Sequence, residues 1–356
     1  MFDFYKNKRV LITGHTGFKG AWLCSVLLQA GAEVTGYALA PPTHPNLFDL
    51  CSLSNRMDSV VGDIRDLDKL RSVFADKKPD IVIHMAAQPI VRESYKNPVY
   101  TYDVNVMGTV NVLECIRLTE SVKSFINVTT DKVYKNKEWE WGYREYEELN
   151  GYDPYSNSKS CSELVTDSYI NSFFQDRDIA VSTMRAGNVI GGGDFAADRI
   201  IPDCVRAALN GEDIIIRNPY AIRPFQHVLE PVAAYLMVAK EQYEKRELAG
   251  SYNVGPDEKD CITTGQLADK FCNSWFNQTG SKVVWINQYD GGPHEAGFLK
   301  LDCSKLKNCF NWKPLWTIDT ALERTIELYL VCRQAQNVDA CMDAQINAYI
   351  KSIRVL

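Results

Sequence analysis

A glycine-rich turn near the N-terminus constrains the fold of this chain more than any other segment. Three glycines, Gly14, Gly17 and Gly20, follow an apolar run at residues 10–12 and precede apolar residues at helical spacing in 21–28. Glycines placed between a strand and a helix allow a tight turn, bring backbone N–H groups close to a phosphate and let the helix pack on the sheet. We therefore predict a dinucleotide-binding strand–turn–helix unit at the start of the chain.

Strands and helices keep alternating after this turn. Short β-branched runs predict strands, and segments with apolar residues every three or four positions predict helices. A chain that alternates in this way forms right-handed crossovers and a doubly wound parallel sheet of the Rossmann type. The expected strands are 10–12, 33–37, 80–84, 125–128, 180–185 and 252–255, and the expected helices include 66–76, 98–119 and 155–174.

The chain is too long for one such sheet alone. Its 356 residues exceed the roughly 250–300 at which a single hydrophobic core stops growing. The alternation breaks after Asn188, and residues 228–244 are apolar enough to return to the sheet. We expect an α/β fold with a smaller, interleaved C-terminal substrate domain. The expected boundaries are 1–187 and 226–256 for the dinucleotide-binding domain, and 188–225 and 257–356 for the substrate domain.

Composition excludes several classes of protein. A net charge of −6 without a Lys/Arg block argues against nucleic-acid binding. No stretch approaches the roughly 18 apolar residues that span a membrane. The eleven cysteines are widely spread and form no Cys-x-x-Cys pair, so we expect reduced core residues in a cytoplasmic protein. His15 and His227 lack a ligand pattern, and we expect no metal.

Tyr155 and Lys159 lie four residues apart, which places them on one face of the helix expected at 155–174. A phenol with an ordinary pKa near 10 serves as a base at neutral pH only if a fixed positive charge lowers its pKa. An adjacent ammonium supplies such a charge, so the pair is a candidate catalytic base. The alternative is a pair on the protein surface.

A second polar group follows the strand expected at 125–128. Thr129, Thr130, Asp131 and Lys132 lie at the carboxyl edge of the sheet, where doubly wound folds bind ligands. An acid beside a base at that edge indicates proton transfer. The alternative is a Thr or Asx turn that satisfies its own backbone.

These residues, in this order, resemble the extended short-chain dehydrogenase/reductase superfamily and, within it, the nucleotide-sugar 4,6-dehydratases. The shared features are the glycine turn, a His84-Met-Ala-Ala87 segment, Asn105 in the long helix and the Tyr155–Lys159 pair. More narrowly, five segments resemble the CDP-glucose 4,6-dehydratase family across essentially the whole chain. They are residues 14–20, 129–134, 138–145, 223–231 and 299–302.

The resemblance implies dehydration of CDP-glucose to CDP-4-keto-6-deoxyglucose, by internal hydride transfer from C4 to C6 through bound NAD. Such a product leads to the deoxy sugars of surface polysaccharide. Tyr155 would deprotonate the 4-hydroxyl and Thr130 would hold it. Relatives typically carry Asp-Glu where this chain has Asp131-Lys132. The resemblance therefore leaves open which of the two is the acid and which the base.

The resemblance also implies an NAD site. In this family an acid usually follows the second strand and binds the adenosine ribose, but residues 34–41 contain none. We still expect NAD, with a weak or mixed preference over NADP. The implied cofactor-binding residues are Gly14, Thr16, Gly17, Phe18, Gly20, Asp63, Ile64, Ala86, Ala87, Asn105, Thr129, Tyr155 and Lys159.

For the substrate, the resemblance places Asn188 and Arg223 near the diphosphate. Arg199, Arg217 and His294 are further candidates, with solvated surface positions as the alternative. Arginines at these places would overcome the negative charge of the whole chain. Relatives pair as homodimers through the helices at 98–119 and 155–174. The first of these carries an apolar stripe, although the same stripe can face the sheet; it consists of Val99, Tyr102, Val106, Val110 and Leu113.

Two kinds of rival function remain at this stage. Another nucleotide-sugar 4,6-dehydratase or a 4-epimerase would share the fold, the cofactor and the Tyr155–Lys159 pair, but an epimerase needs no acid–base pair at C5 and C6. An NAD-binding regulator without turnover would be expected to have lost Tyr155 or Lys159, and both are present.

Overall fold

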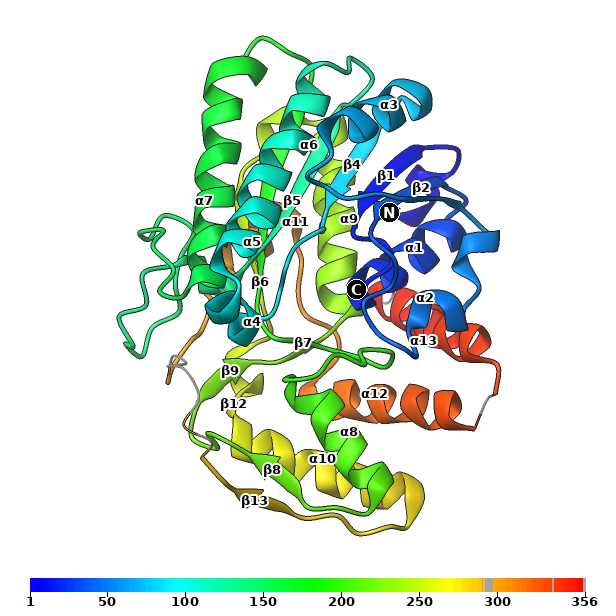
Figure 1. The fold of residues 1–356 in the computed structure, drawn as a ribbon, viewed down its shortest axis with the longest axis vertical. Helices are drawn as coiled ribbons and strands as arrows, with labels where there is room; N and C mark the ends of the chain where they lie inside the picture. The colour runs from blue at the N-terminus through cyan, green and yellow to red at the C-terminus, as the bar shows by residue number, and fades with distance from the viewer. Residues whose placement is uncertain (290, 292–296, 335, 355–356) are drawn as a thin grey trace.

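The computed structural model describes residues 1–289, 291, 297–334 and 336–354. Its larger lobe is built on a seven-stranded parallel sheet with the order β11-β6-β5-β4-β1-β2-β3. The smaller lobe lies beyond the carboxyl ends of these strands, at the bottom of Figure 1. The expected fold class is confirmed.

The strands of the sheet coincide with the apolar runs of the sequence, and β5 is buried along its whole length. Only β3 was not expected. It is one of the two edge strands, with two residues half-buried and two exposed, and its sequence lacks the apolar run that marks the others. The strands are β1 (Arg9–Thr13), β2 (Glu33–Ala38), β3 (Asp58–Val61), β4 (Ile81–His84), β5 (Ser124–Thr130), β6 (Ala180–Ala186) and β11 (Ser251–Val254).

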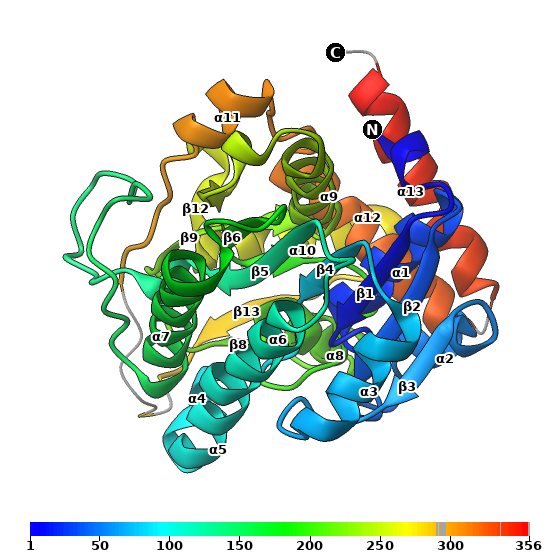
Figure 2. The ribbon, with the colours of Figure 1, turned by 90° about the horizontal axis from the view of Figure 1, so that it is seen from above.

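Helices cover both faces of the sheet, as the view from above shows (Figure 2). Helices α1 and α9 pack on one face, and α3, α6 and α7 pack on the other. The helices of this lobe are α1 (Phe18–Gln29), α2 (Leu47–Leu50), α3 (Leu67–Lys77), α4 (Val91–Lys96), α5 (Pro98–Tyr102), α6 (Gly108–Arg117), α7 (Pro154–Tyr169) and α9 (Leu229–Glu244).

The two long helices expected from the sequence both contain a π-helical segment. The first consists of α5, a π segment at Asp103–Met107 and α6; the second is α7 followed by a π segment at Ile170–Phe174. Local chemistry fixes the start of α7, since the Asp153 side chain accepts a hydrogen bond from Ser156 N and Pro154 occupies the first turn.

The smaller lobe packs three helices against short strand pairs around a core of its own. Strand β7 pairs with β10 where the chain passes between the lobes. The elements of this lobe and of the passage between the lobes are β7 (Val189–Ile190), α8 (Ile200–Asn210), β8 (Ile214–Ile216), β9 (Ile222–Pro224), β10 (Gln226–His227), β12 (Cys261–Thr263), α10 (Thr264–Thr279), β13 (Trp285–Asn287) and α12 (Ile318–Arg333).

The C-terminal helix returns to the larger lobe. Met342, Ile346 and Tyr349 of α13 (Val338–Arg354) belong to the same hydrophobic core as α1 and α9, as does Leu306 of α11 (Ser304–Phe310). By packing, therefore, parts of 257–356 belong to the larger lobe. None of the helices in the described part of the chain is both long and apolar enough to cross a membrane.

Candidate active site

The glycine turn has the geometry of an anion-binding helix start. Gly14 has φ +79°, and a Cβ there would lie 2.7 Å from the backbone N of Ala86. A Cβ on Gly20 would lie 2.2 Å from the carbonyl oxygen of Gly14. Gly17 is the N-cap of α1 and provides no side-chain hydrogen bond. The first N–H groups of α1 therefore have no side-chain cap, and they lie at the carboxyl ends of the strands.

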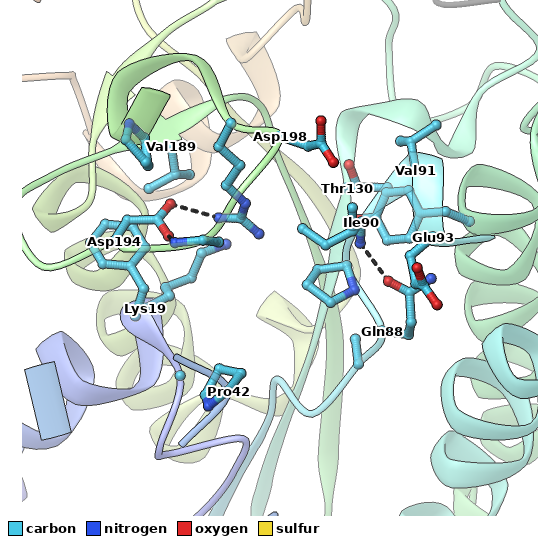
Figure 3. Close-up of a pocket in the computed structure, with 18 of the residues that line it drawn as sticks. Lys19, Pro42, Gln88, Ile90, Val91, Glu93, Thr130, Val189, Asp194 and Asp198 are labelled. Carbon is cyan, nitrogen blue, oxygen red and sulfur yellow. Dashed lines mark hydrogen bonds and ion pairs between the residues drawn. The ribbon is translucent and has the colours of Figure 1, made fainter. Parts of the chain in front are cut away.

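This turn lines a cavity of about 1090 Å³ that lies between the two lobes. Figure 3 shows Lys19 and Pro42 on one side of it, and Gln88, Ile90 and Glu93 on the other. Its volume exceeds the usual upper range of a site for one small ligand. The cavity is therefore large enough for two ligands.

Tyr155 and Lys159 both line the cavity from the first turns of α7. The Lys159 ammonium donates a hydrogen bond of 3.1 Å to the carbonyl oxygen of Val128 on β5. Burial raises the pKa of Tyr155 to about 12, while a hydrogen bond with Thr130 acts to lower it. Burial lowers the pKa of Lys159 to about 8. The pair is buried together in the cavity wall, so it is not a surface pair.

Thr130, Asp131 and Lys132 line the same cavity at the end of β5. The Thr130 hydroxyl donates a hydrogen bond of 2.9 Å to Oδ1 of Asp131, and the Asp131 side chain is buried. Burial raises the pKa of Asp131, although the positive charges of Lys132 and Arg223 act in the opposite direction. The Thr130 oxygen also accepts a hydrogen bond from the backbone N of Lys132, as the turn alternative anticipated.

Lys19 is a residue of this site that the sequence analysis missed. It lies inside the glycine turn, lines the cavity and places its ammonium 3.4 Å from the Tyr235 hydroxyl. Burial, together with the positive charges of Arg199 and Lys159, lowers its pKa to about 7. A charged side chain in the first turn of the otherwise apolar α1 is the signal that could have identified it.

The substrate candidates of the smaller lobe line the other end of the cavity. Asn188, Arg199, Arg217 and Arg223 all do so, and Arg223 is buried. Arg199 pairs with Asp194 at 2.9 Å. Arg217 pairs with Asp198, also at 2.9 Å. The remaining candidate, His294, lies outside the described residues.

Most of the expected cofactor-binding residues share this cavity, including Thr16, Phe18, Asp63, Ile64, Ala86, Ala87 and Thr129. Asn105 differs, because it is buried behind the cavity wall. Its amide donates to the Gln88 carbonyl oxygen at 3.1 Å and to Ser158 at 2.8 Å, and its oxygen accepts from Gln88 N. Asn105 thus fixes Gln88, which lines the cavity.

Residues 11–325 match the sequence profile of the family described as GDP-mannose 4,6 dehydratase. The chain belongs to this family. It is 46% identical to the CDP-glucose 4,6-dehydratase of Salmonella typhimurium over 356 residues, which cover 98% of each protein. This confirms the resemblance to the nucleotide-sugar 4,6-dehydratases. A CDP-paratose 2-epimerase of Salmonella typhi is 24% identical over 86% of this chain and 94% of that protein.

Solved structures share the fold of this dehydratase family member at lower identity. A UDP-glucose 4-epimerase of Stenotrophomonas maltophila, with bound NAD and formylated UDP-arabinopyranose, has a TM-score of 0.80 and 19% identity, covering 92% of this chain and all of that one. The dTDP-glucose 4,6-dehydratase of Bacillus anthracis with NAD has a TM-score of 0.75 and 22% identity, over 92% and 98%.

The residues of this dehydratase fit a dinucleotide in the cavity. A Cβ on Gly17 would meet no atom closer than the Gly14 carbonyl oxygen at 3.5 Å, so the backbone there is open to a ligand. The Thr16 hydroxyl ties the turn to the end of β2 by a hydrogen bond of 2.9 Å to the Leu39 carbonyl oxygen. A pyrophosphate can therefore approach the N–H groups at the start of α1.

Proposed function

We propose that this protein dehydrates CDP-glucose to CDP-4-keto-6-deoxyglucose. One observation carries the proposal: the Tyr155–Lys159 pair and the Thr130-Asp131-Lys132 segment line a single cavity. The first is suited to the oxidation of a sugar hydroxyl, and the second to the loss of water. The Salmonella typhimurium relative named for this reaction supports the choice of CDP-glucose.

We propose NAD as the cofactor, held by the glycine turn, by Asp63 and Ile64 after β3, and by Ala86 and Ala87 after β4. When bound, NAD supplies a hydride acceptor for C4, a hydride donor for C6 and a positive charge beside Tyr155. Solved structures of the same fold that contain NAD support this assignment.

In the first step, Tyr155 accepts the proton of the 4-hydroxyl and Thr130 holds that hydroxyl by a hydrogen bond. Burial disfavours the phenolate, so Tyr155 needs nearby positive charge to act as a base. Lys159 lies one helical turn away and supplies that charge when it is protonated. The protonation of Lys159 therefore controls the base.

In the second step, the ketone at C4 makes the C5 proton acidic, and the 6-hydroxyl leaves as water. One group must take the C5 proton and another must protonate the hydroxyl. Asp131 and Lys132 line the cavity for these two roles. The raised pKa of Asp131 favours its protonated form, and so favours Asp131 as the acid and Lys132 as the base.

We assign the diphosphate of the substrate to the smaller lobe. Four polar residues line the cavity there: Asn188, Arg199, Arg217 and Arg223. A guanidinium group can donate two parallel hydrogen bonds to the oxygens of one phosphate. This assignment keeps the proposed division of the chain. Residues 1–187 and 226–256 bind the dinucleotide, and residues 188–225 and 257–356 bind the nucleotide sugar, with α13 in a supporting role.

We further propose that the protein acts as a homodimer through the helices of 98–119 and 155–174. Leu113 faces the core, whereas Val99, Met107, Leu164 and Phe173 of these helices and their π segments are exposed apolar side chains. Exposed apolar patches of this kind are typical of interfaces.

All eleven cysteines are unpaired, which agrees with a cytoplasmic enzyme. Its 4-keto-6-deoxy product is a precursor of the deoxy sugars of surface polysaccharide.

A panel of nucleotide sugars tests the proposal. Purified protein with NAD is incubated with CDP-, dTDP-, UDP- and GDP-glucose and with GDP-mannose, and 4-keto sugar is read by its absorbance in alkali. We expect the highest kcat/KM with CDP-glucose. Conversion of a sugar to its 4-epimer, without a 4-keto product, would instead show an epimerase.

A further inference from the structure

Two buried charged residues, one on α7 and one on β6, have no part in the chemistry described above. Glu163 and Arg185 form an ion pair with a distance of 2.8 Å between Oε2 and Nη2, and both side chains are 3% exposed. Replacing such a pair by apolar residues of similar volume is often neutral for stability. Stability alone is therefore a weak explanation for this pair.

Glu163 lies on the same face of α7 as the catalytic residues, since positions 155, 159 and 163 follow at intervals of four. All three lie beside the end of β5. Lys159 donates to the Val128 carbonyl oxygen, Glu163 accepts a bond of 2.5 Å from the Thr129 hydroxyl, and Tyr155 lines the same cavity as Thr130. Two hydrogen bonds thus join the helix to the strand.

The carboxylate of Glu163 is held in place from several sides. Its Oε1 also accepts from Arg185 Nε at 2.9 Å, and its Oε2 accepts from the Thr183 hydroxyl at 2.6 Å. Arg185 in turn donates to the Tyr134 hydroxyl and to the Glu145 carbonyl oxygen, both at 2.9 Å. A carboxylate so completely bonded has a fixed position relative to Lys159.

We propose that Glu163 is a positioning residue of the reaction, which fixes the strand end that carries Thr130 and supplies the negative charge that Lys159 faces. This inference rests on the proposed role of Tyr155 and Lys159. Burial works against the ammonium of Lys159, and the charge of Glu163 opposes that effect by raising its pKa. Without Glu163, Lys159 would lose its proton at a lower pH and would no longer support a phenolate at Tyr155.

The test replaces the ion pair without leaving a buried charge. In Glu163→Gln/Arg185→Met the glutamine still accepts the Thr129 hydrogen bond, but the negative charge is gone. Should this protein fail to fold, Glu163→Met/Arg185→Leu replaces the pair by apolar side chains. Glu163→Asp retains the charge and serves as the rescue variant. The control is Arg9→Met/Asp80→Asn. It removes an ion pair at the amino-terminal ends of β1 and β4, away from the cavity.

The first measurement needs neither substrate nor cofactor. Protein labelled with ¹³C at the ε carbon of lysine is titrated by NMR, and the Lys159 resonance is assigned by its loss in Lys159→Met. We expect its pKa to fall by about one unit or more in both double variants, with little change in Glu163→Asp and in the control. An unchanged Lys159 titration in a folded double variant would overturn the inference.

The second measurement is the pH profile of kcat/KM with CDP-glucose. The limb at which activity is lost with rising pH should move to lower pH by about the same amount, which lowers activity at pH 8 about fivefold. The KM should change little. A wild-type protein that does not convert CDP-glucose would refute the proposed function, while the NMR titration would still decide the role of Glu163.

Discussion

The Thr130 hydroxyl donates its hydrogen bond to Oδ1 of Asp131, 2.9 Å away, and leaves the other oxygen of that carboxyl without a partner. This Oδ2 is buried and has no hydrogen-bond partner within the described ranges. A buried carboxyl oxygen without a partner is costly in the charged form. The arrangement therefore favours a protonated Asp131 that is ready to donate to the leaving 6-hydroxyl.

Lys132→Met tests the other half of this acid–base pair. We expect it to bind CDP-glucose and to lower product formation by at least about hundredfold, because one group of the elimination is gone. The control is Lys135→Met, an exposed lysine paired with Glu148.

A second experiment assigns the role of Lys132. The Lys132→Met protein is incubated with CDP-glucose in heavy water, and deuterium uptake at C5 of the recovered substrate is measured. Loss of uptake makes Lys132 the base, and retained uptake makes it the acid. A rate within tenfold of wild type would make Lys132 a bystander.

Tyr155→Phe removes only the oxygen that, in the proposed mechanism, accepts the 4-hydroxyl proton. We expect nearly unchanged affinity for CDP-glucose, measured by calorimetry, and a loss of kcat of several orders of magnitude. Lys159→Met should be similarly impaired, with its residual activity shifted to higher pH. Tyr146→Phe, at an exposed tyrosine, is the matched control. A Tyr155→Phe enzyme that retains a tenth of the wild-type rate would refute the assignment of the base.

The cofactor preference follows from the end of β2. The cavity there is lined by Ala38, Leu39, Ala40, Pro42 and Thr43, which offer neither an acid for the ribose hydroxyls nor a cation for a 2′-phosphate. We expect NAD to bind, but weakly enough that purified protein loses it and regains activity on its addition. Titration of cofactor-free protein with NAD and NADP measures the preference. Activation by NADP that is tenfold tighter than by NAD would contradict the assignment.

Glu230 gives the fold a pH dependence of its own. Burial raises its pKa from 4.5 to about 7, although it accepts hydrogen bonds from Tyr349 and from the backbone N of Leu315 and Trp316. Because the pKa is higher in the folded state, the stabilisation is present below pH 4.5 and is lost as the pH rises through 7. Its full extent is on the order of 3 kcal/mol.

Thermal denaturation between pH 5 and pH 8 tests this effect. Glu230→Gln cannot ionise, so the melting temperature of the wild type should fall relative to that of the variant by several degrees over this range. Glu244→Gln, an exposed carboxylate on the same helix, should follow the wild type. Parallel curves for the wild type and Glu230→Gln would show that Glu230 has no raised pKa.

The sequence predicted the sheet and the two segments that line the cavity because both are local patterns. Gly14 to Gly20 and Tyr155 to Lys159 are short spacings, and the strands are apolar runs. The contacts that organise the site are not local. Glu163 meets Arg185 across 22 positions, Asn105 meets Ser158 across 53, and Lys19 meets Tyr235 across 216. Such pairs form only when α7, α9 and the π segment at Asp103–Met107 pack against the rest of the fold. No spacing along the chain reveals this packing.

The central claim is an internal transfer of hydrogen from C4 to C6 of a nucleotide sugar. Purified protein with NAD is given CDP-glucose that carries deuterium at C4, and the product is examined by NMR and mass spectrometry. The account predicts CDP-4-keto-6-deoxyglucose with the deuterium at C6. Deuterium lost to solvent, or recovered at C4 of an epimer, would contradict it.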